Sequence, residues 1–397
     1  MKMRKLYRFV IFPLIVLVSC TFFHEIYPQK KDSKRVIWEP EWIKYQDSLT
    51  GREVWQITSH DSVSVPCYFE NQAFTADEKF LVFTSNRTGT WEIYSACLEN
   101  GEITALTTLC MSDNPRYTIN PAGTGVCFIN EWILYKIDID DLYLDTLMNF
   151  SGLLPAKPRF SASYTNDGRY TLVSASTDSM QMLYRVDLST KQIRLILKKS
   201  EGRFSHPLIC PTDPNVITYV PGPDTQNNMS LPMQERARTW KIDLSKDENK
   251  PFLVCPYGYR ATHESWSKNG ERFYFYRKTV PGWKPVTISS INKNGEDFKG
   301  HFTSDTIRLG HGSPDQDEKW FISDSQDPWT NPLMLINLES QESHIICWTN
   351  SSIAEGHTEF THVHPFFSPT GKYVCFTSDR TGVCQVYVVP IEDLTNK

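Results

Sequence analysis

Five of the ten histidines stand at matching positions along the chain, each shortly before a polar turn motif. His362 and His364 are two residues apart, so on a β-strand their side chains point to the same face. The other three are His206, His263 and His311. Imidazole is a good ligand for several transition metals, so histidines that converge on one space predict a metal site. The alternative is that these side chains only hydrogen-bond neighbouring strands.

The turn motifs that follow these histidines belong to a repeat. It is clearest in FSPTGKYVCFTSDRTG at 367–382 and in FTADEKFLVFTSNRTG at 74–89. Weaker copies centre on 120–123, 165–168, 211–214, 267–270 and 314–317. Asp, Asn, Gly and Pro supply tight turns, and apolar β-rich runs follow them. Seven copies at intervals of roughly 45–55 residues predict an all-β fold, a seven-bladed β-propeller. The repeats resemble the TolB-like propeller repeat.

The two ends of the repeat region predict how the ring closes. The last copy stops after its third strand, near Val389, whereas Glu53–Thr58 precedes the first copy and reads as an extra strand. We expect Glu53–Thr58 to supply the fourth strand of the last blade, because closure of this kind covers an open sheet edge. Gly101–Thr107 reads as the outer strand of the first blade.

The repeat also places the histidines. In a propeller, the first strand of each blade lines the central channel. Residues that enter this strand sit at one mouth, and the five histidines fall just before the first turn of a blade: His206 in blade four, His263 in blade five, His311 in blade six, and His362 and His364 in blade seven. We therefore expect four successive blades to direct imidazoles into one space at one mouth of the channel.

The N-terminus reads as a targeting segment. Four basic residues precede an apolar run at 9–18 that is too short for an ordinary membrane span. The run ends in Leu17-Val18-Ser19-Cys20, which resembles a bacterial lipobox. We expect a signal peptide over 1–20, lipidation at Cys20, a tether over 21–40 and the propeller over 41–397. The protein would then be exported and lipid-anchored in the bacterial cell envelope, touching the membrane only through its anchor.

Composition restricts the classes of partner and of chemistry that the protein is expected to have. The formal net charge is −5 and no basic stripe stands out, so nucleic acid is not an expected partner. Nine cysteines remain after Cys20, and none forms a CxxC pair that would suggest zinc or redox chemistry. We expect them to be small buried hydrophobic residues, with a disulfide left open.

Several short motifs, in one shared order, resemble the oligogalacturonate lyases of polysaccharide lyase family 22. They are the sequences TGREV at 50–54, YFENQAFT at 68–75, HPLICPTDPN at 206–215, RTW at 238–240, THESW at 262–266 and HVHP at 362–365. Members of this family are seven-bladed propellers that cleave short galacturonides by β-elimination. They hold a divalent metal, usually manganese, with three histidines and a glutamine.

The resemblance implies a role for each matching residue. His311, His362 and His364 match the metal histidines, and Glu359 stands where the family has its glutamine. The resemblance further implies that His263 is the catalytic base and that Arg238 contacts a substrate carboxylate. The implied cofactor is Mn²⁺ or another divalent metal, and the implied substrate is an oligogalacturonide or another uronate oligosaccharide released during pectin degradation.

These residue types suit an elimination next to a carboxylate. A divalent cation stabilises the negative charge that develops when the C5 proton of a uronate leaves, and a neutral imidazole takes up that proton near neutral pH. The alternative function is a lipid-anchored, non-catalytic propeller that binds an oligosaccharide or a protein partner. The Glu359 carboxylate, which adds negative charge beside an anionic substrate, favours that alternative.

Overall fold

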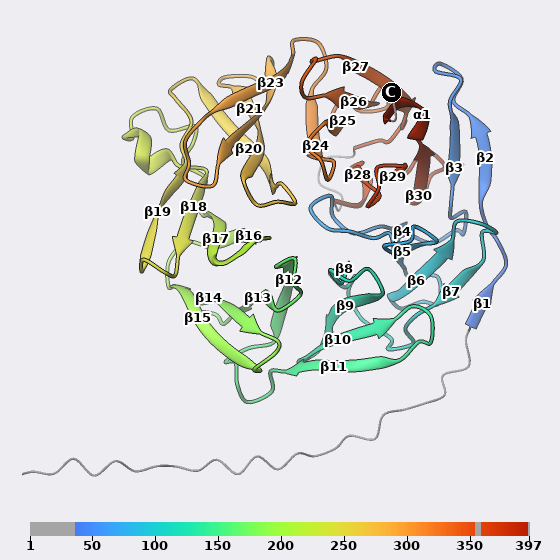
Figure 1. The fold of residues 1–397 in the computed structure, drawn as a ribbon, viewed down its shortest axis with the longest axis horizontal. Coiled ribbons are helices and arrows are strands. Elements are labelled where there is room, and N and C mark those ends of the chain that lie inside the picture. Colours follow the sequence, from blue (N-terminus) through green and yellow to red (C-terminus); the bar gives the residue numbers. More distant parts are fainter. Residues whose placement is uncertain (1–35, 354–358, 396–397) are drawn as a thin grey trace, which may run out of the picture.

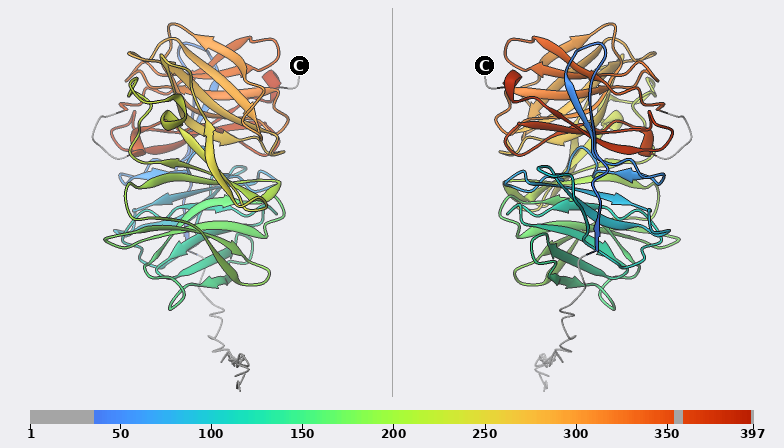
Figure 2. Two further views of the ribbon diagram at one scale, coloured as in Figure 1. Left: turned by 90° about the vertical axis from the view of Figure 1, so that its left-hand side faces the viewer. Right: turned by 90° about the vertical axis from the view of Figure 1, so that its right-hand side faces the viewer.

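The chain folds into seven antiparallel sheets arranged as a ring (Figure 1). The computed structural model describes residues 36–353 and 359–395. Side views show the sheets stacked around the ring as a thick disc (Figure 2). The predicted all-β, seven-bladed propeller is therefore confirmed. Among the described residues, no helix is long and apolar enough to cross a lipid bilayer.

The first three blades follow the chain from the channel outward. Blade one contains β4 (Ser64–Val65), β5 (Phe80–Ser85), β6 (Glu92–Cys97) and β7 (Ile103–Ala105). Blade two contains β8 (Tyr117–Ile119), β9 (Gly125–Asn130), β10 (Ile133–Asp138) and β11 (Leu144–Asn149). Blade three contains β12 (Pro158–Tyr164), β13 (Tyr170–Ser176), β14 (Gln181–Asp187) and β15 (Gln192–Lys199).

Blades four to six repeat this order. Blade four contains β16 (Phe204–Cys210), β17 (Asp213–Pro221), β18 (Thr239–Asp243) and β19 (Glu248–Leu253). Blade five contains β20 (Tyr259–Trp266), β21 (Arg272–Thr279), β22 (Val286–Asn292) and β23 (Lys299–Ser304). Blade six contains β24 (Leu309–Pro314), β25 (Trp320–Ser325), β26 (Pro332–Asn337) and β27 (Ser343–Trp348). The short 3-10 helix η1 (Met233–Arg236) lies between β17 and β18.

Blade seven joins the two ends of the chain. It contains β28 (Phe366–Phe367), β29 (Tyr373–Ser378) and β30 (Gln385–Pro390), preceded by the 3-10 helix η2 (Glu359–Thr361) and followed by α1 (Glu392–Thr395). Its outer strands come from the N-terminal side: β3 (Glu53–Gln56) pairs with β30, and β2 (Ile43–Gln46) pairs with β3. Figure 1 shows these blue strands beside the dark red ones. The predicted closure is therefore confirmed.

One further strand covers the outer edge of blade one. Residues of the segment expected to be a tether form β1 (Val36–Trp38), which pairs antiparallel with β7. The tether as predicted at 21–40 therefore overlaps the folded part. A strand of three residues is too short to show an alternating sequence pattern. Its pairing partner also lies more than sixty residues away in the chain (Val36 with Ala105), so nothing local indicates the pairing.

The turn between the first and second strands of a blade is closed by side chains. In blade one, Thr75 Oγ1 donates to Asp77 Oδ1 (2.7 Å), and the backbone N–H of Phe80 donates back to Thr75 Oγ1 (3.1 Å). Thr165 and Asp167 form the same pair in blade three. These short polar residues bond their own backbone, which is why the repeat is recognisable at its turns.

The core consists of the apolar layers between neighbouring blades. In one layer, Val82 of blade one and Val126 of blade two belong to the same buried cluster as Cys375 of blade seven. All nine cysteines among the described residues are free thiols, and seven of them are buried. This confirms the expected hydrophobic role, and no disulfide forms within the described part of the chain.

Candidate functional site

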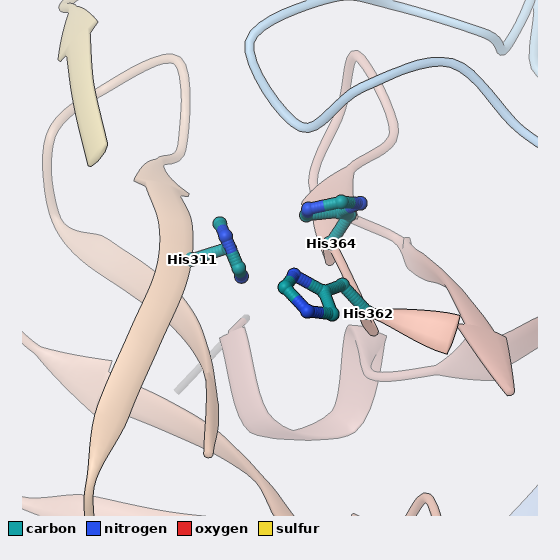
Figure 3. A group of neighbouring side chains, drawn as sticks. All are labelled: His311, His362 and His364. Atoms are coloured by element: carbon teal, nitrogen blue, oxygen red, sulfur yellow. The ribbon is translucent and has the colours of Figure 1, made fainter. Parts of the chain in front are cut away.

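The three predicted metal histidines come together in the structure (Figure 3). His311 lies on β24, and His362 and His364 lie in the segment between η2 and β28. One nitrogen from each ring lies within 4.8 Å of the other two. His311 and His364 are buried, and His362 is half-buried.

The spacing of these nitrogens suits a single ion. A metal–imidazole bond is about 2.1 Å long, so two nitrogens on the same ion lie at most about 4.2 Å apart. The three nitrogens, which lie within 4.8 Å of one another, are close to that distance. Three imidazoles suit several first-row transition metals, manganese included.

Asp324 on β25 fixes the orientation of His311. Its Oδ1 accepts the backbone N–H of His311 (2.6 Å), and its Oδ2 lies 3.0 Å from His311 Nδ1. The carboxylate therefore holds the proton on Nδ1 and leaves Nε2 free to bind a metal, an arrangement typical of metal-bound histidines. This contact is the observation in the structure that most specifically fits a metal site.

Glycines on both sides of His311 make this contact possible. A Cβ atom on Gly310 would lie 2.6 Å from Asp324 Oδ1, and one on Gly312 would lie 1.9 Å from the carbonyl oxygen of Ile322. Both distances are shorter than real contacts, so a side chain at either position would push β24 away from β25. His311 is thus held between two residues that let the strands approach closely.

Aromatic residues from the loop after β4 wall the metal site. The ring of Tyr68 lies 4.6 Å from that of His364, and the ring of Phe69 lies 5.6 Å from that of His311, measured between centroids. Burial lowers the pKa of His364 well below its ordinary value, and the nearby His311 and His362 add to the shift. His364 is therefore neutral and able to act as a ligand near neutral pH.

His263 lies beside the metal histidines. It is on β20, and its ring centroid is 4.0 Å from that of His311. Its Nδ1 lies 2.9 Å from the carbonyl oxygen of Gly310. A carbonyl only accepts, so Nδ1 carries the proton and Nε2 keeps the lone pair. Burial lowers the pKa of His263 well below its ordinary value, and His311 and Lys278 lower it further. The ring is therefore neutral near neutral pH, with a lone pair on Nε2.

Arg238 is close to the site but already holds a carboxylate. Its Nε and Nη2 donate to the two oxygens of Glu264 at 2.6 and 3.3 Å. Both side chains are largely buried, with Glu264 on β20 next to His263. The remaining nitrogen, Nη1, lies outside this ion pair. Arg238 is thus held by Glu264, the residue next to His263.

His206 is not one of the three converging ligands. It lies on β16 at the same mouth, and its Nδ1 is 3.9 Å from Glu70 Oε1. Burial raises the pKa of Glu70 to about 8, and repulsion from Glu264 adds to the rise. Glu70 is therefore mostly protonated at neutral pH.

Two predicted positions lie outside what the structure describes. Cys20 belongs to residues 1–35. The backbone of Glu359 begins η2, three residues before His362, but its side chain is outside the described part. Their predicted roles therefore remain predictions.

Sequence reasoning did not assign roles to Asp324, Glu70, Glu264 or Lys278. Lys278 on β21 is fully buried, and burial, reinforced by Arg308, lowers its pKa to about 7. Asp324 is thirteen residues from His311, on the neighbouring strand. The strand–turn–strand spacing of the repeat could have found it, because position 324 on the second strand lies opposite the bulge that contains His311.

Comparison with known proteins agrees with this geometry, although no protein-family model matches the chain. An oligogalacturonide lyase of Pectobacterium atrosepticum is 25% identical over 88% of this chain and 96% of its own length. An oligogalacturonate lyase of Dickeya dadantii is 24% identical over the same shares.

A solved structure shares the fold. An oligogalacturonate lyase in complex with manganese superposes with a TM-score of 0.76 at 20% identity, covering 90% of this chain and 98% of the other. The resemblance predicted from sequence motifs is therefore confirmed: over most of its length, this chain is similar in sequence and in fold to the oligogalacturonate lyases.

Proposed function

We propose that this protein is a metal-dependent lyase that cleaves oligogalacturonides, or related uronate oligosaccharides, by β-elimination. The observation that carries the proposal is the group of His311, His362 and His364, with His311 oriented by Asp324, beside a neutral His263. The similarity to the curated lyases over 88% of the chain supports the choice of substrate class.

The three histidines, with Glu359 as a proposed fourth ligand, would hold a divalent cation such as Mn²⁺. When bound, this cation stabilises the negative charge that develops on the uronate carboxylate. Among the described residues, its ligands are three histidine side chains, and Asp324 contacts Nδ1 of His311 rather than Nε2.

His263 supplies the base. Its Nε2 accepts the C5 proton of the uronate, the C5–H electron pair forms the C4=C5 double bond, and the C4–O4 bond breaks. The departing oxygen takes a proton from solvent water, and His263 later releases the C5 proton to solvent, which restores the base. Arg238 contributes its Nη1 to contact with a substrate carboxylate, while its other nitrogens hold Glu264.

The direct test is product formation. Full-length protein loaded with Mn²⁺ is incubated with digalacturonate, and the unsaturated or keto-uronate product is followed by chromatography. We expect product with wild-type protein and a loss of roughly 10²–10⁴-fold in kcat for His263→Ala. The proposal fails if protein with stoichiometric bound Mn²⁺ releases no product.

We also propose that the protein is exported and lipidated at Cys20, which the lipobox-like sequence supports. Cys20→Ala removes the acceptor thiol, so the protein should shift from the membrane fraction to the soluble fraction of the cell. Fractionation and mass spectrometry of the N-terminal peptide measure this. An unlipidated wild-type peptide would rule the anchor out.

A further inference from the structure

Arginines recur at one position of the innermost strands. In four successive blades an arginine stands three residues before a residue within the register shift of the innermost strand: Arg159 before Ala162, Arg203 before His206, Arg260 before His263, and Arg308 before His311. Arg116 directly precedes the innermost strand of blade two. Equivalent positions on neighbouring blades lie at the same level of the ring, so these arginines share the mouth that holds the histidines.

Three of these arginines line a cavity beside the metal site. The cavity has a volume of about 490 Å³ and is lined by Arg116, Arg159 and Arg203 together with His206 and His364. Its size is within the range of small-molecule sites. It therefore extends from the metal histidine His364 across the inner strands of blades two, three and four.

The three guanidinium groups are available to a ligand. All three arginines are exposed, and none forms an ion pair with a carboxylate in the part of the chain that the structure describes. The arginines of the next two blades differ. Arg260 pairs with Asp224 at 3.2 Å, and the Arg308 guanidinium lies 4.3 Å from the Trp283 ring centroid.

The cavity wall carries a net positive charge. Glu70 is the one acidic residue among the described residues that line it, and its raised pKa of about 8 keeps it mostly protonated at neutral pH. Three arginines thus line a cavity with little opposing charge. Guanidinium binds carboxylates in bidentate geometry, and such charge-assisted hydrogen bonds are among the strong ones.

We propose that Arg116, Arg159 and Arg203 bind the carboxylates of uronate units beyond the one that reacts at the histidine cluster. The substrate class in this inference rests on the proposed function. The site would select acidic oligosaccharides over neutral or methyl-esterified ones and would favour trimers over dimers, because a longer acidic chain reaches more arginines.

The test measures binding with turnover blocked. Trigalacturonate is titrated calorimetrically into full-length, Mn²⁺-loaded protein carrying His263→Ala. In that background, Arg159→Gln and Arg203→Gln should each raise the Kd about tenfold, and the double variant about a hundredfold. Arg194→Gln is the matched control, because Arg194 is an exposed arginine on the outermost strand β15. It should leave the Kd within about twofold, since it lies away from the cavity.

Separate results decide the two proposals. Unchanged Kd in the double variant, no saturable binding of trigalacturonate, or equal binding of its methyl ester each overturns the arginine site. Arginine-dependent binding without cleavage by wild-type protein would preserve the site and reject the lyase. In active protein, Arg159→Gln and Arg203→Gln should raise KM for trigalacturonate more than they change kcat, and thermal melts should match wild type.

Discussion

At the residue scale, the proposed metal site would depend on a carboxylate that is not itself one of the proposed ligands. Asp324 accepts both the backbone N–H and Nδ1–H of His311. Asp324→Asn leaves a single acceptor oxygen for two donors and removes the negative charge. We expect Mn²⁺ affinity to fall about 10–100-fold, measured by calorimetry on folded protein. Asp317→Asn, at an exposed position, is the control. Equal affinity for both variants would show that Asp324 does not orient the ligand.

If His263 is the base, as proposed, its protonation state sets the pH dependence of kcat/KM. Its pKa is lowered, chiefly by burial, so the neutral base persists above that pKa and is lost only when the pH falls through it. We therefore expect kcat/KM to stay level from about pH 8 down past about 6.5, the ordinary histidine value, and to decline only at a lower pH. Metal content is measured at each pH, because protonation of the ligands would also release the ion. An acidic limb centred above pH 7 in fully metal-loaded protein contradicts this assignment.

At the element scale, bulges in the innermost strands turn the histidines toward the channel. The pairing register shifts between Thr262 and Ser265 on β20 and between Ser205 and Leu208 on β16. His263 and His206 lie within these shifts and have φ values of 55° and 46°. The repeat could predict that histidines stand on these strands. It could not predict the bulges, because a positive φ at a non-glycine residue leaves no local sequence pattern. It also could not predict that Glu264 pairs with Arg238, because a contact between two strands leaves no such pattern either.

Strand β3, which closes the ring by pairing with β30, can be tested directly. Val54 and Ile57 are fully buried, and Thr58 Oγ1 donates to Gln385 Oε1 across the closure. A chain that begins at Ser59 loses these contacts and leaves β30 uncovered. We expect its Tm to fall by roughly 10 °C or more, since burying each apolar side chain contributes roughly 1.5–3 kcal/mol.

The control for this truncation is a chain that begins at Glu41. Of the strands that the structure describes, this chain lacks only the partly exposed edge strand β1. Its Tm should fall much less, as scanning calorimetry can measure. Equal melting of the two truncated chains would mean that β3 is not what closes the ring.

At the scale of the whole molecule, the charge at the cavity is opposite in sign to the net charge of the chain. The chain carries a formal charge of −5, yet Arg116, Arg159 and Arg203 face the cavity beside the histidines. A polyanionic substrate is therefore repelled by the molecule at long range and attracted at the mouth. Clefts lined by one sign of charge concentrate field lines and raise association rates. Raising the salt concentration from about 0.02 M to about 0.5 M shortens the screening length to a few ångströms.

This distribution predicts a salt-dependent rate. We expect kcat/KM for trigalacturonate to fall several-fold over that salt range in wild-type protein, because screening weakens attraction at the mouth more than it relieves the weaker repulsion from the rest of the surface. Arg159→Gln with Arg203→Gln should flatten the dependence, whereas Arg194→Gln should not. Initial rates at fixed, saturating Mn²⁺ measure this. A rate that rises with salt in wild-type protein would mean that the overall negative charge, rather than the arginine-lined mouth, governs how the substrate approaches.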